Sequence, residues 1–202
     1  MSGSILYIHG FNSSPLSTKA RQLEAVMQRL GLADRLRVPA LHHHPRQAIE
    51  QLQAAIAELG APLLVGSSLG GYYATHLAEQ HGLKALLINP AVAPHRLFDG
   101  YLGTQRNLYT DEAWELTLDH VDALAALDVP APQDASRYQV WLQTGDETLD
   151  YRQAERHYRA CALRIQAGGD HSYQGFAAQL PALLAFAGIA RGQYAALDFS
   201  VF

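Results

Sequence analysis

The segment Gly66-Ser67-Ser68-Leu69-Gly70 has residue types and a spacing that could supply a nucleophile. It matches the pattern G-x-S-x-G and lies between a short apolar run, 63–65, and a stretch with helical features, which is the context that the motif requires. On such a sharp turn, small residues two positions before and after the serine relieve crowding, and the helix dipole favours developing negative charge. The glycine spacing centres on Ser68, with Ser67 as the competing hydroxyl and a purely structural turn as the alternative.

A serine hydroxyl needs a base, and the base needs a third group that holds its tautomer. In chains with this turn the order is serine, then an acid, then histidine. His171 follows the last expected strand, 163–166, behind two glycines, and is the candidate base; the alternative is a polar residue that opens the final helix. Among the other histidines after Ser68, His76 and His81 fall on the helix that follows the serine and point away from its start. His120 and His157 lie on expected helices without a suitable partner.

The acid should follow the preceding strand, 138–143. Asp146 comes directly after it in Thr144-Gly145-Asp146-Glu147 and is the favoured acid. Asp150 competes, but it precedes a helix and has Gln153 three positions on, which is typical of a helix N-cap with its capping-box partner. Glu147 is the third candidate.

Two backbone N–H groups should stabilise an oxyanion beside this serine. One belongs to Leu69, which follows the serine, and the other to Phe11, in the loop after the first expected strand. Gly10 lets that loop turn so that the amide of Phe11 points into the site. Each donor would lower the barrier by roughly 2.7–4 kcal/mol. We interpret His9 as a residue that holds the loop rather than one that transfers protons.

Short apolar runs alternate with helical patterns, which predicts a parallel sheet with crossover helices. We expect a compact α/β-hydrolase fold with a mostly parallel sheet of about six strands, as one domain over 1–202 with a helical cap insertion at about 91–135. The expected strands are 5–8, 36–38, 63–65, 85–88, 138–143 and 163–166, and the expected helices are 15–30, 45–59, 69–80, 151–160 and 174–187. The insertion's aromatic residues could line an acyl pocket or form its own small core; they are Phe98, Tyr101, Tyr109 and Trp114.

Composition argues against several classes of function. The 202 residues carry a net charge of −4, with no basic footprint for nucleic acid or anionic lipid. No apolar run approaches the roughly 20 residues that cross a bilayer. The single cysteine, Cys161, and an N-terminus without a basic signal region make a cytoplasmic location the expectation. His42-His43-His44 lacks the cysteine or acid spacing that would complete a metal site.

Several motifs together resemble a known family. They are YIHGFNSSP at 7–15, GSSLGGYYAT at 66–75, TGDE at 144–147 and GGDH at 168–171, with NPAV at 89–92 and LDYRQA at 149–154. In this order, over roughly 5–188, the sequence is similar to the YqiA-type bacterial esterases. The resemblance implies an α/β-hydrolase core, serine-type esterase activity on acyl esters or acyl-CoA thioesters, and Ser68, Asp146 and His171 as the triad. The apolar tail after Arg191 departs from the family pattern.

The hypothesis is therefore acyl transfer without a cofactor, on a small-molecule acyl ester or acyl-CoA. Ser68 would attack the carbonyl while His171 takes its proton and Asp146 orients His171, and water would then release the acid. Two alternatives stay open: an amidase or peptidase with the same triad, and a ligand-binding protein on a hydrolase scaffold that does little chemistry. The sequence carries no signal for acyl chain length or oligomeric state.

Overall fold

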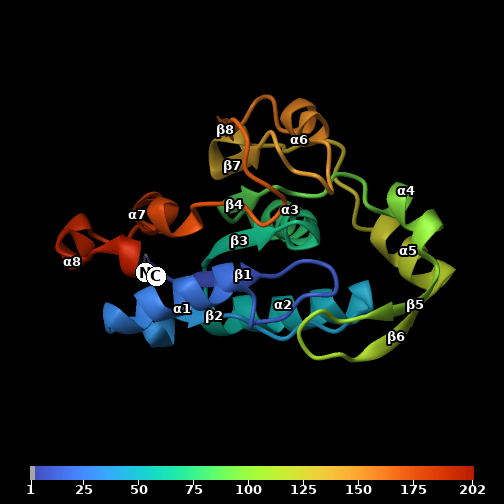
Figure 1. Ribbon diagram of the computed structural model, residues 1–202, viewed down its shortest axis with the longest axis horizontal. Coiled ribbons are helices and arrows are strands. Elements are labelled where there is room, and N and C mark those ends of the chain that lie inside the picture. The colour runs from blue at the N-terminus through green and yellow to red at the C-terminus, as the bar shows by residue number, and fades with distance from the viewer. Residues whose placement is uncertain (1–2) are drawn as a thin grey trace.

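The computed structural model describes residues 3–202, and its central feature is a six-stranded sheet with parallel neighbours throughout. The strand order is β2-β1-β3-β4-β7-β8 (Figure 1). The strands are β1 (Ile5–Ile8), β2 (Leu36–Arg37), β3 (Leu63–Ser67), β4 (Ala85–Ile88), β7 (Tyr138–Gln143) and β8 (Ala162–Gln166). The predicted parallel sheet is confirmed.

Helices cover both faces of this sheet, so most of its strand residues are buried on both sides. One face carries α2 (Pro45–Leu59), α3 (Leu69–His81) and α6 (Tyr151–His157), and the other carries α1 (Thr18–Arg29) and α7 (Phe176–Phe186). Alternate residues of β1 divide between the two cores: Leu6 and Ile8 pack under α2 and α3, whereas Ile5 and Tyr7 pack under α1 and α7.

Most elements lie within a few residues of their expected bounds. The main shift is in α1, which begins at Thr18 rather than at 15. The preceding residues form a turn in which the amide of Ser17 donates to the carbonyl of Ser14 and the amide of Leu16 donates to the Ser14 hydroxyl. This turn places the start of α1 beside the carboxyl end of the sheet.

The insertion between β4 and β7 contains a β-hairpin as well as short helices. Its elements are α4 (His95–Phe98), the 3₁₀ turn η2 (Asp99–Tyr101), β5 (Gly103–Arg106), β6 (Ala113–Leu116), α5 (Leu118–Ala125) and the 3₁₀ turn η3 (Ala135–Arg137). The expectation of short helices alone is corrected by the antiparallel pair β5–β6, on which Trp114 and Leu116 are buried and Glu115 is exposed. Figure 1 shows the insertion on the right, beyond the end of β1.

The C-terminal tail packs on the α1–α7 side of the molecule. It forms α8 (Arg191–Tyr194) and the 3₁₀ turn η4 (Phe199–Val201). Tyr194 is buried, and its ring packs edge-to-face with that of Phe199 at 6.3 Å between ring centroids. Gln22 Nε2 donates to the Phe202 carbonyl at 3.2 Å. The apolar residues of the tail therefore extend one of the two cores.

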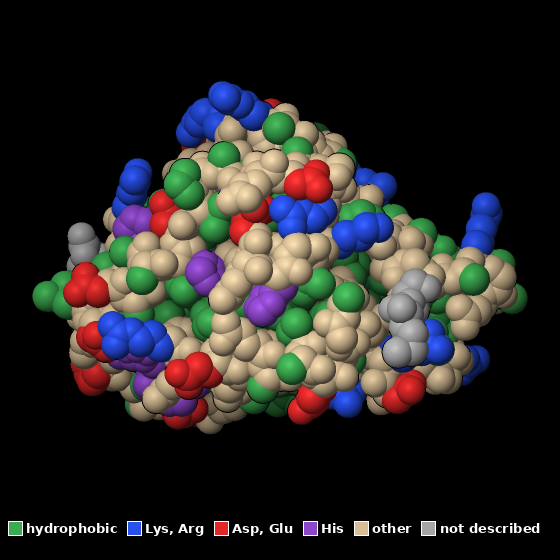
Figure 2. Space-filling view, turned by 180° about the vertical axis from the view of Figure 1, so that it is seen from behind, with side chains coloured by type: hydrophobic (Ala, Val, Ile, Leu, Met, Phe, Trp, Pro, Cys, Tyr) green, Lys and Arg blue, Asp and Glu red, His purple; other side chains and the backbone are tan. Residues whose placement is uncertain are grey.

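The outer surface mixes charges of both signs. Figure 2 shows basic and acidic side chains spread over the back of the molecule, with histidines gathered beside both kinds at the lower left. Within residues 3–202, no helix combines the length and the apolar character needed to cross a membrane.

The packing of the tail generates a stability prediction. Tyr194→Ala should lower the free energy of unfolding by about 3 kcal/mol, because it removes a buried aromatic ring and leaves a cavity. Val201→Ala, at a side chain that is 72% exposed in the same tail, should change it by less than about 0.5 kcal/mol. Urea unfolding of the two variants measures both values. Equal effects would show that the tail does not contribute to the core.

Candidate active site

Ser68 lies at the turn between β3 and α3, in a backbone conformation that few side-chain-bearing residues adopt. Its φ is 55° and its ψ is −123°, a region that costs about 1–3 kcal/mol for a residue with a Cβ. The turn is held from the next strand: the amide of Ser68 donates to the Ile88 carbonyl, and the amide of Ala91 donates to the Ser68 carbonyl, both at 3.0 Å. The surrounding hydrogen bonds thus hold a strained residue at the carboxyl edge of the sheet.

The two glycines of the motif allow backbones to approach where no Cβ fits. A Cβ on Gly66 would overlap the carbonyl of Gly70, and a Cβ on Gly70 would overlap the carbonyls of Ile8 and His9 at the end of β1. The G-x-S-x-G spacing therefore lets β1, β3 and α3 pack closely around a sharp turn. This turn presents the Ser68 side chain at the edge of the sheet.

His171 bridges the candidate nucleophile and the candidate acid. Its Nε2 lies 3.0 Å from Ser68 Oγ, and its Nδ1 lies 2.8 Å and 2.9 Å from the two carboxylate oxygens of Asp146. With Nδ1–H donating to the carboxylate, Nε2 is left to accept the serine proton. The side chain of Asp146 is 2% exposed and that of His171 is 23% exposed. The structure brings the three predicted residues together in the order Ser–His–Asp.

Local hydrogen bonds separate the roles of the three acids that the sequence offered. Asp146 Oδ1 accepts from the amides of Thr148 and Leu149 at 2.9 Å and 2.8 Å, which fixes the carboxylate toward His171. Asp150 instead caps α6, where its Oδ1 accepts from the amide of Arg152 at 3.0 Å. Glu147 Oε2 accepts from the backbone amide of His171 at 3.0 Å and so helps to hold the backbone of the histidine.

Two buried polar residues that the sequence analysis missed hold the loop that carries His171. Gln143 Oε1 accepts from the amides of Asp170 and Gln174 at 3.1 Å and 2.9 Å. Asn89 Nδ2 donates to the carbonyls of Asp170 and His171 at 3.0 Å and 3.3 Å, and Asn89 Oδ1 accepts from the amide of Gln143 at 3.0 Å. Both side chains are nearly inaccessible. The β4, β7 and β8 loops are thereby joined in one network.

The loop after β1 passes directly beside the serine. A Cβ at Gly10 would lie 3.1 Å from Ser68 Cβ, a tight contact that a larger residue would relieve only by a small shift of the loop or of Ser68. His9 is buried and neutral, because burial lowers its pKa. Its Nδ1 donates to the Gly10 carbonyl at 3.1 Å and its Nε2 accepts from the amide of Leu41 at 3.2 Å. These bonds hold the loop, in agreement with the interpretation of His9.

The insertion hairpin holds the same loop by hydrogen bonds to Asn12. Asn12 Oδ1 accepts from Trp114 Nε1 at 2.9 Å, its Nδ2 donates to Gln105 at 3.2 Å, and its carbonyl accepts from the amide of Leu108 at 2.9 Å. Phe11, the preceding residue, packs its ring 4.7 Å from that of Phe98. Among the described residues, neither the amide of Phe11 nor that of Leu69 donates to another protein group, so both stay available to a ligand.

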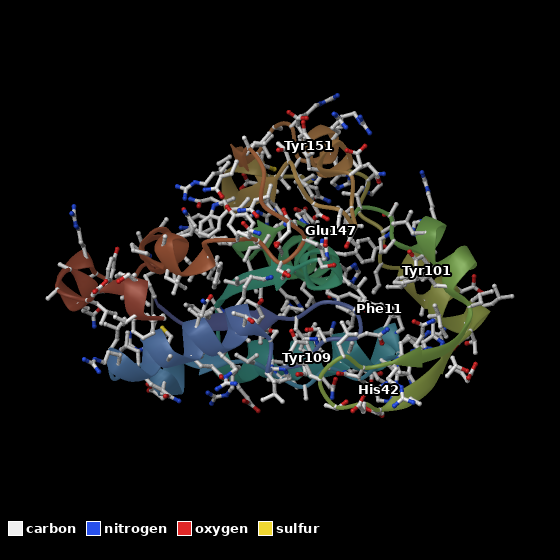
Figure 3. All side chains as sticks on the ribbon, viewed as in Figure 1. Phe11, His42, Tyr101, Tyr109, Glu147 and Tyr151 are labelled. Atoms are coloured by element: carbon white, nitrogen blue, oxygen red, sulfur yellow. The ribbon has the colours of Figure 1, made fainter. Side chains whose placement is uncertain are left out.

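Two cavities flank the loop after β1, and His9, Gly10, Phe11 and Ser13 line both. The hairpin-side cavity, of about 270 Å³, is completed by Leu69, Tyr73, the segment 40–43 and residues of the hairpin, including Trp114. The histidine-side cavity, of about 190 Å³, is completed by Ser68, His171, the start of α1 and the hairpin tip. In Figure 3, Glu147 lies above Phe11 and Tyr109, so the loop after β7 faces the loop after β1 and the hairpin tip.

The aromatic residues proposed for substrate binding separate into different roles. Trp114 lines the hairpin-side cavity. Phe98 is buried behind Phe11 and lines neither cavity, and Tyr101 is 58% exposed with its ring against Phe98. Substrate contact by Phe98 and Tyr101 stays a prediction: neither residue lines the two cavities, and Phe98 packs against Phe11, which lines both.

The histidine run and the cysteine have structural surroundings. His44 caps α2 and pairs with Asp119 at 2.8 Å, whereas His43 stacks on Trp114 at 4.8 Å between ring centroids. Among the side chains that the structure describes, no three of His, Cys, Asp or Glu are arranged to hold a metal ion. Burial raises the pKa of the Cys161 thiol to about 11, so it stays protonated near neutral pH.

Comparison with known proteins shows that the sequence matches a described family over most of its length. The "Uncharacterised protein family (UPF0227)" matches residues 4–188. A UPF0227 protein of Shewanella woodyi is 27% identical over 194 residues, which cover 90% of this chain and 98% of that relative. This match is consistent with the resemblance found in the sequence.

Solved structures confirm the predicted α/β-hydrolase fold. A monoacylglycerol lipase of Paleococcus ferrophilus has a TM-score of 0.66 at 14% identity, covering 91% of this chain and 95% of that one. Mouse alpha/beta hydrolase domain-containing protein 10 has a TM-score of 0.65 at 14% identity, covering 92% and 89%. At this level of identity the likeness concerns the fold alone.

The network around Asn89 generates a prediction. Asn89→Ala should lower the free energy of unfolding by about 2 kcal/mol, because it leaves the buried amide of Gln143 without an acceptor and removes a donor to the carbonyls of Asp170 and His171. Gln28→Ala, at an exposed position of α1, should change it by less than about 0.5 kcal/mol. Chemical unfolding of both variants tests this. A loss no larger for Asn89→Ala than for Gln28→Ala would contradict the proposed function of the network.

Proposed function

We propose that this chain, which belongs to the UPF0227 family, is a serine esterase that cleaves acyl esters or acyl-CoA thioesters through an acyl-enzyme on Ser68. The observation that carries the proposal is the position of His171, whose two ring nitrogens contact Ser68 and Asp146 at 3.0 Å and 2.8 Å. This is the arrangement in which a histidine can accept a serine proton while a carboxylate holds its tautomer.

In the first half of the cycle, Ser68 Oγ attacks the substrate carbonyl and His171 Nε2 takes its proton. The carbonyl oxygen becomes negative, and the amides of Phe11 and Leu69 are the proposed donors to it, each worth about 10²–10³ in kcat. When the tetrahedral intermediate collapses, the bond to the leaving oxygen or sulfur breaks. The imidazolium of His171 then protonates that atom, and an acyl ester remains on Ser68.

The second half releases the acid. Water enters on the side that the alcohol or thiol has left, and His171 removes its proton as it attacks the acyl carbonyl. Collapse of the second intermediate returns the proton from His171 to Ser68 Oγ. Asp146 stays ionised and stabilises the imidazolium in both halves. The two halves need only the groups described above and water.

The two cavities suggest where each half of the substrate lies. The leaving atom must lie near His171 Nε2, which protonates it, so the alcohol or thiol is assigned to the histidine-side cavity. The acyl group then extends past the amides of Phe11 and Leu69 into the hairpin-side cavity, between Leu41, Tyr73 and Trp114. The apolar side chains there suit a hydrocarbon chain.

Substitution of the three residues tests the mechanism. By analogy with other serine hydrolases, Ser68→Ala should lower kcat on p-nitrophenyl butyrate on the order of 10⁶-fold, and Asp146→Asn on the order of 10⁴-fold, through the wrong tautomer of His171. Asp150→Asn is the matched control, because asparagine caps a helix about as well as aspartate and should leave kcat unchanged. Near-normal turnover by Ser68→Ala, or a larger loss in Asp150→Asn than in Asp146→Asn, would refute the assignment.

The acyl cavity makes a separate prediction. Leu41→Trp should fill part of the hairpin-side cavity and lower kcat/KM for octanoyl esters about tenfold relative to acetyl esters. The acetyl ester serves as the internal control, because its short chain does not reach residue 41. A uniform loss on all chain lengths would place the acyl group elsewhere.

A further inference from the structure

The histidine-side cavity holds a cation that the proposed chemistry does not use. Lys19, in the first turn of α1, lines it together with Ser68 and His171. Lys19 is one of only two lysines in the sequence; the other is Lys84. A lysine inside a cavity of about 190 Å³ that also contains a candidate nucleophile and its base lies within reach of any substrate bound there.

The charge of Lys19 is not matched by a contact ion pair. Its Nζ donates to the carbonyl of Ser172 at 2.8 Å, which uses one of its three N–H bonds. No carboxylate oxygen of a side chain that the structure describes lies within 4.0 Å of this nitrogen. Asp170 and Asp146 act on it only from a greater distance. Two N–H bonds of Lys19 are thus left for a ligand.

The polar part of the remaining lining suits an anion, and Phe11, Leu108 and Tyr109 supply its apolar part. The cavity is bordered by the hydroxyl-bearing residues Ser13, Ser17, Thr18 and Ser172. The first turn of α1 contains no acidic residue, and no side chain caps its amides. Ser17 Oγ is buried and lies beside the Tyr7 hydroxyl. A helix start of this kind carries a partial positive charge on the same side as the ammonium.

We infer that the histidine-side cavity binds a compact anionic group, a carboxylate or a phosphate, on the alcohol half of the substrate, with Lys19 as its counter-ion. This inference rests on the proposed function, because it takes the leaving atom to lie at His171. In the step that releases the alcohol, the imidazolium of His171 protonates the leaving oxygen as the carbon–oxygen bond breaks. The product is a neutral hydroxyl that still carries its anionic group, and Lys19 keeps its proton throughout.

A matched pair of esters tests the inference. 4-Carboxyphenyl butyrate carries an anion on the leaving group, and 4-carbamoylphenyl butyrate is its neutral counterpart of nearly equal size. For each ester, kcat/KM is first divided by the rate constant for its uncatalysed hydrolysis by hydroxide, which corrects for leaving-group reactivity. The measured quantity is the ratio of the two corrected values, charged ester over neutral ester. We expect a ratio above about ten in the native protein and a fall of about tenfold in Lys19→Gln, since a single ion pair at intermediate dielectric supplies such a factor.

The choice of variants separates charge from positioning. Glutamine can still donate to the Ser172 carbonyl, so Lys19→Gln removes the charge while a hydrogen bond to the His171 loop stays possible. Lys19→Arg should preserve the ratio, and Lys84→Gln, at the opposite end of the sheet just before β4, should leave it unchanged. An equal loss on both esters in Lys19→Gln would mean that Lys19 only positions the loop, and would overturn the inference.

The pH dependence of the ratio gives a second readout. Burial lowers the pKa of Lys19 to about 8, against the opposing attraction of Asp170 and Asp146. Lys19 is therefore charged below that pH and neutral above it, so the ratio should fall as pH rises from 7 to 9.5 in the native protein but not in Lys19→Arg. His171 serves both esters and cancels in the ratio, and the buried Tyr7 hydroxyl stays neutral because burial raises its pKa. An equal fall of the ratio in Lys19→Arg, whose side chain stays charged over this range, would contradict the role of Lys19.

Further arms locate the anion and identify its kind. 4-Nitrophenyl hemisuccinate places the charge on the acyl half, and 4-nitrophenyl succinamate is its neutral counterpart. A Lys19 dependence confined to that pair would overturn the assignment to the alcohol. 4-Phosphonophenyl butyrate compares a phosphate-like group with the carboxylate, and a larger ratio for either identifies the preferred anion. Failure of the proposed function would appear as turnover of both esters that persists in Ser68→Ala. Failure of this inference alone would appear as Ser68-dependent turnover with a ratio near one.

Discussion

The position of the His171 imidazole is the constraint on which the site depends. One ring must contact a carboxylate on the loop after β7 and a hydroxyl on the turn after β3, at 2.8 Å and 3.0 Å. A rotation of the ring or a shift of its loop would break both contacts at once. The sheet brings the loops together, because parallel strands place their carboxyl ends at one edge. The buried amides of Asn89 and Gln143 then fix the histidine loop by hydrogen bonds from β4 and β7.

The same edge of the sheet also divides the space around Ser68. The loop after β1 runs beside the serine and separates the hairpin-side cavity from the histidine-side cavity. Asn12 connects this loop to the insertion hairpin, whose tip borders the histidine-side cavity and whose other residues line the hairpin-side cavity and hold the amide of Phe11 in place. The start of α1 borders the other cavity and brings Lys19 into it. Each half of a substrate would therefore meet a different part of the fold.

The fold and the three central residues could be predicted because each has a local signal. Ser68 stands in a glycine pattern, and Asp146 and His171 each follow an apolar strand in the expected order. Asn89 and Gln143 carry no such signal: the first looks like a strand stop before proline, and the second is the polar end of a strand. Their importance lies in contacts between loops distant in sequence. The hairpin was missed because its strands have four residues each, too few for a clear alternation. Lys19 reads as an ordinary polar residue of α1, and only tertiary packing brings it to the cavity.

Mass-spectrometric mapping of a fluorophosphonate adduct on the folded protein tests the central claim most directly, because the reagent reacts only with a serine that a neighbouring base activates. The geometry around His171 predicts one adduct, on Ser68, that forms on the native protein and does not form when the protein is unfolded in urea before the reagent is added. An adduct on Ser67 instead, or no adduct on the folded protein, would contradict the account of the site.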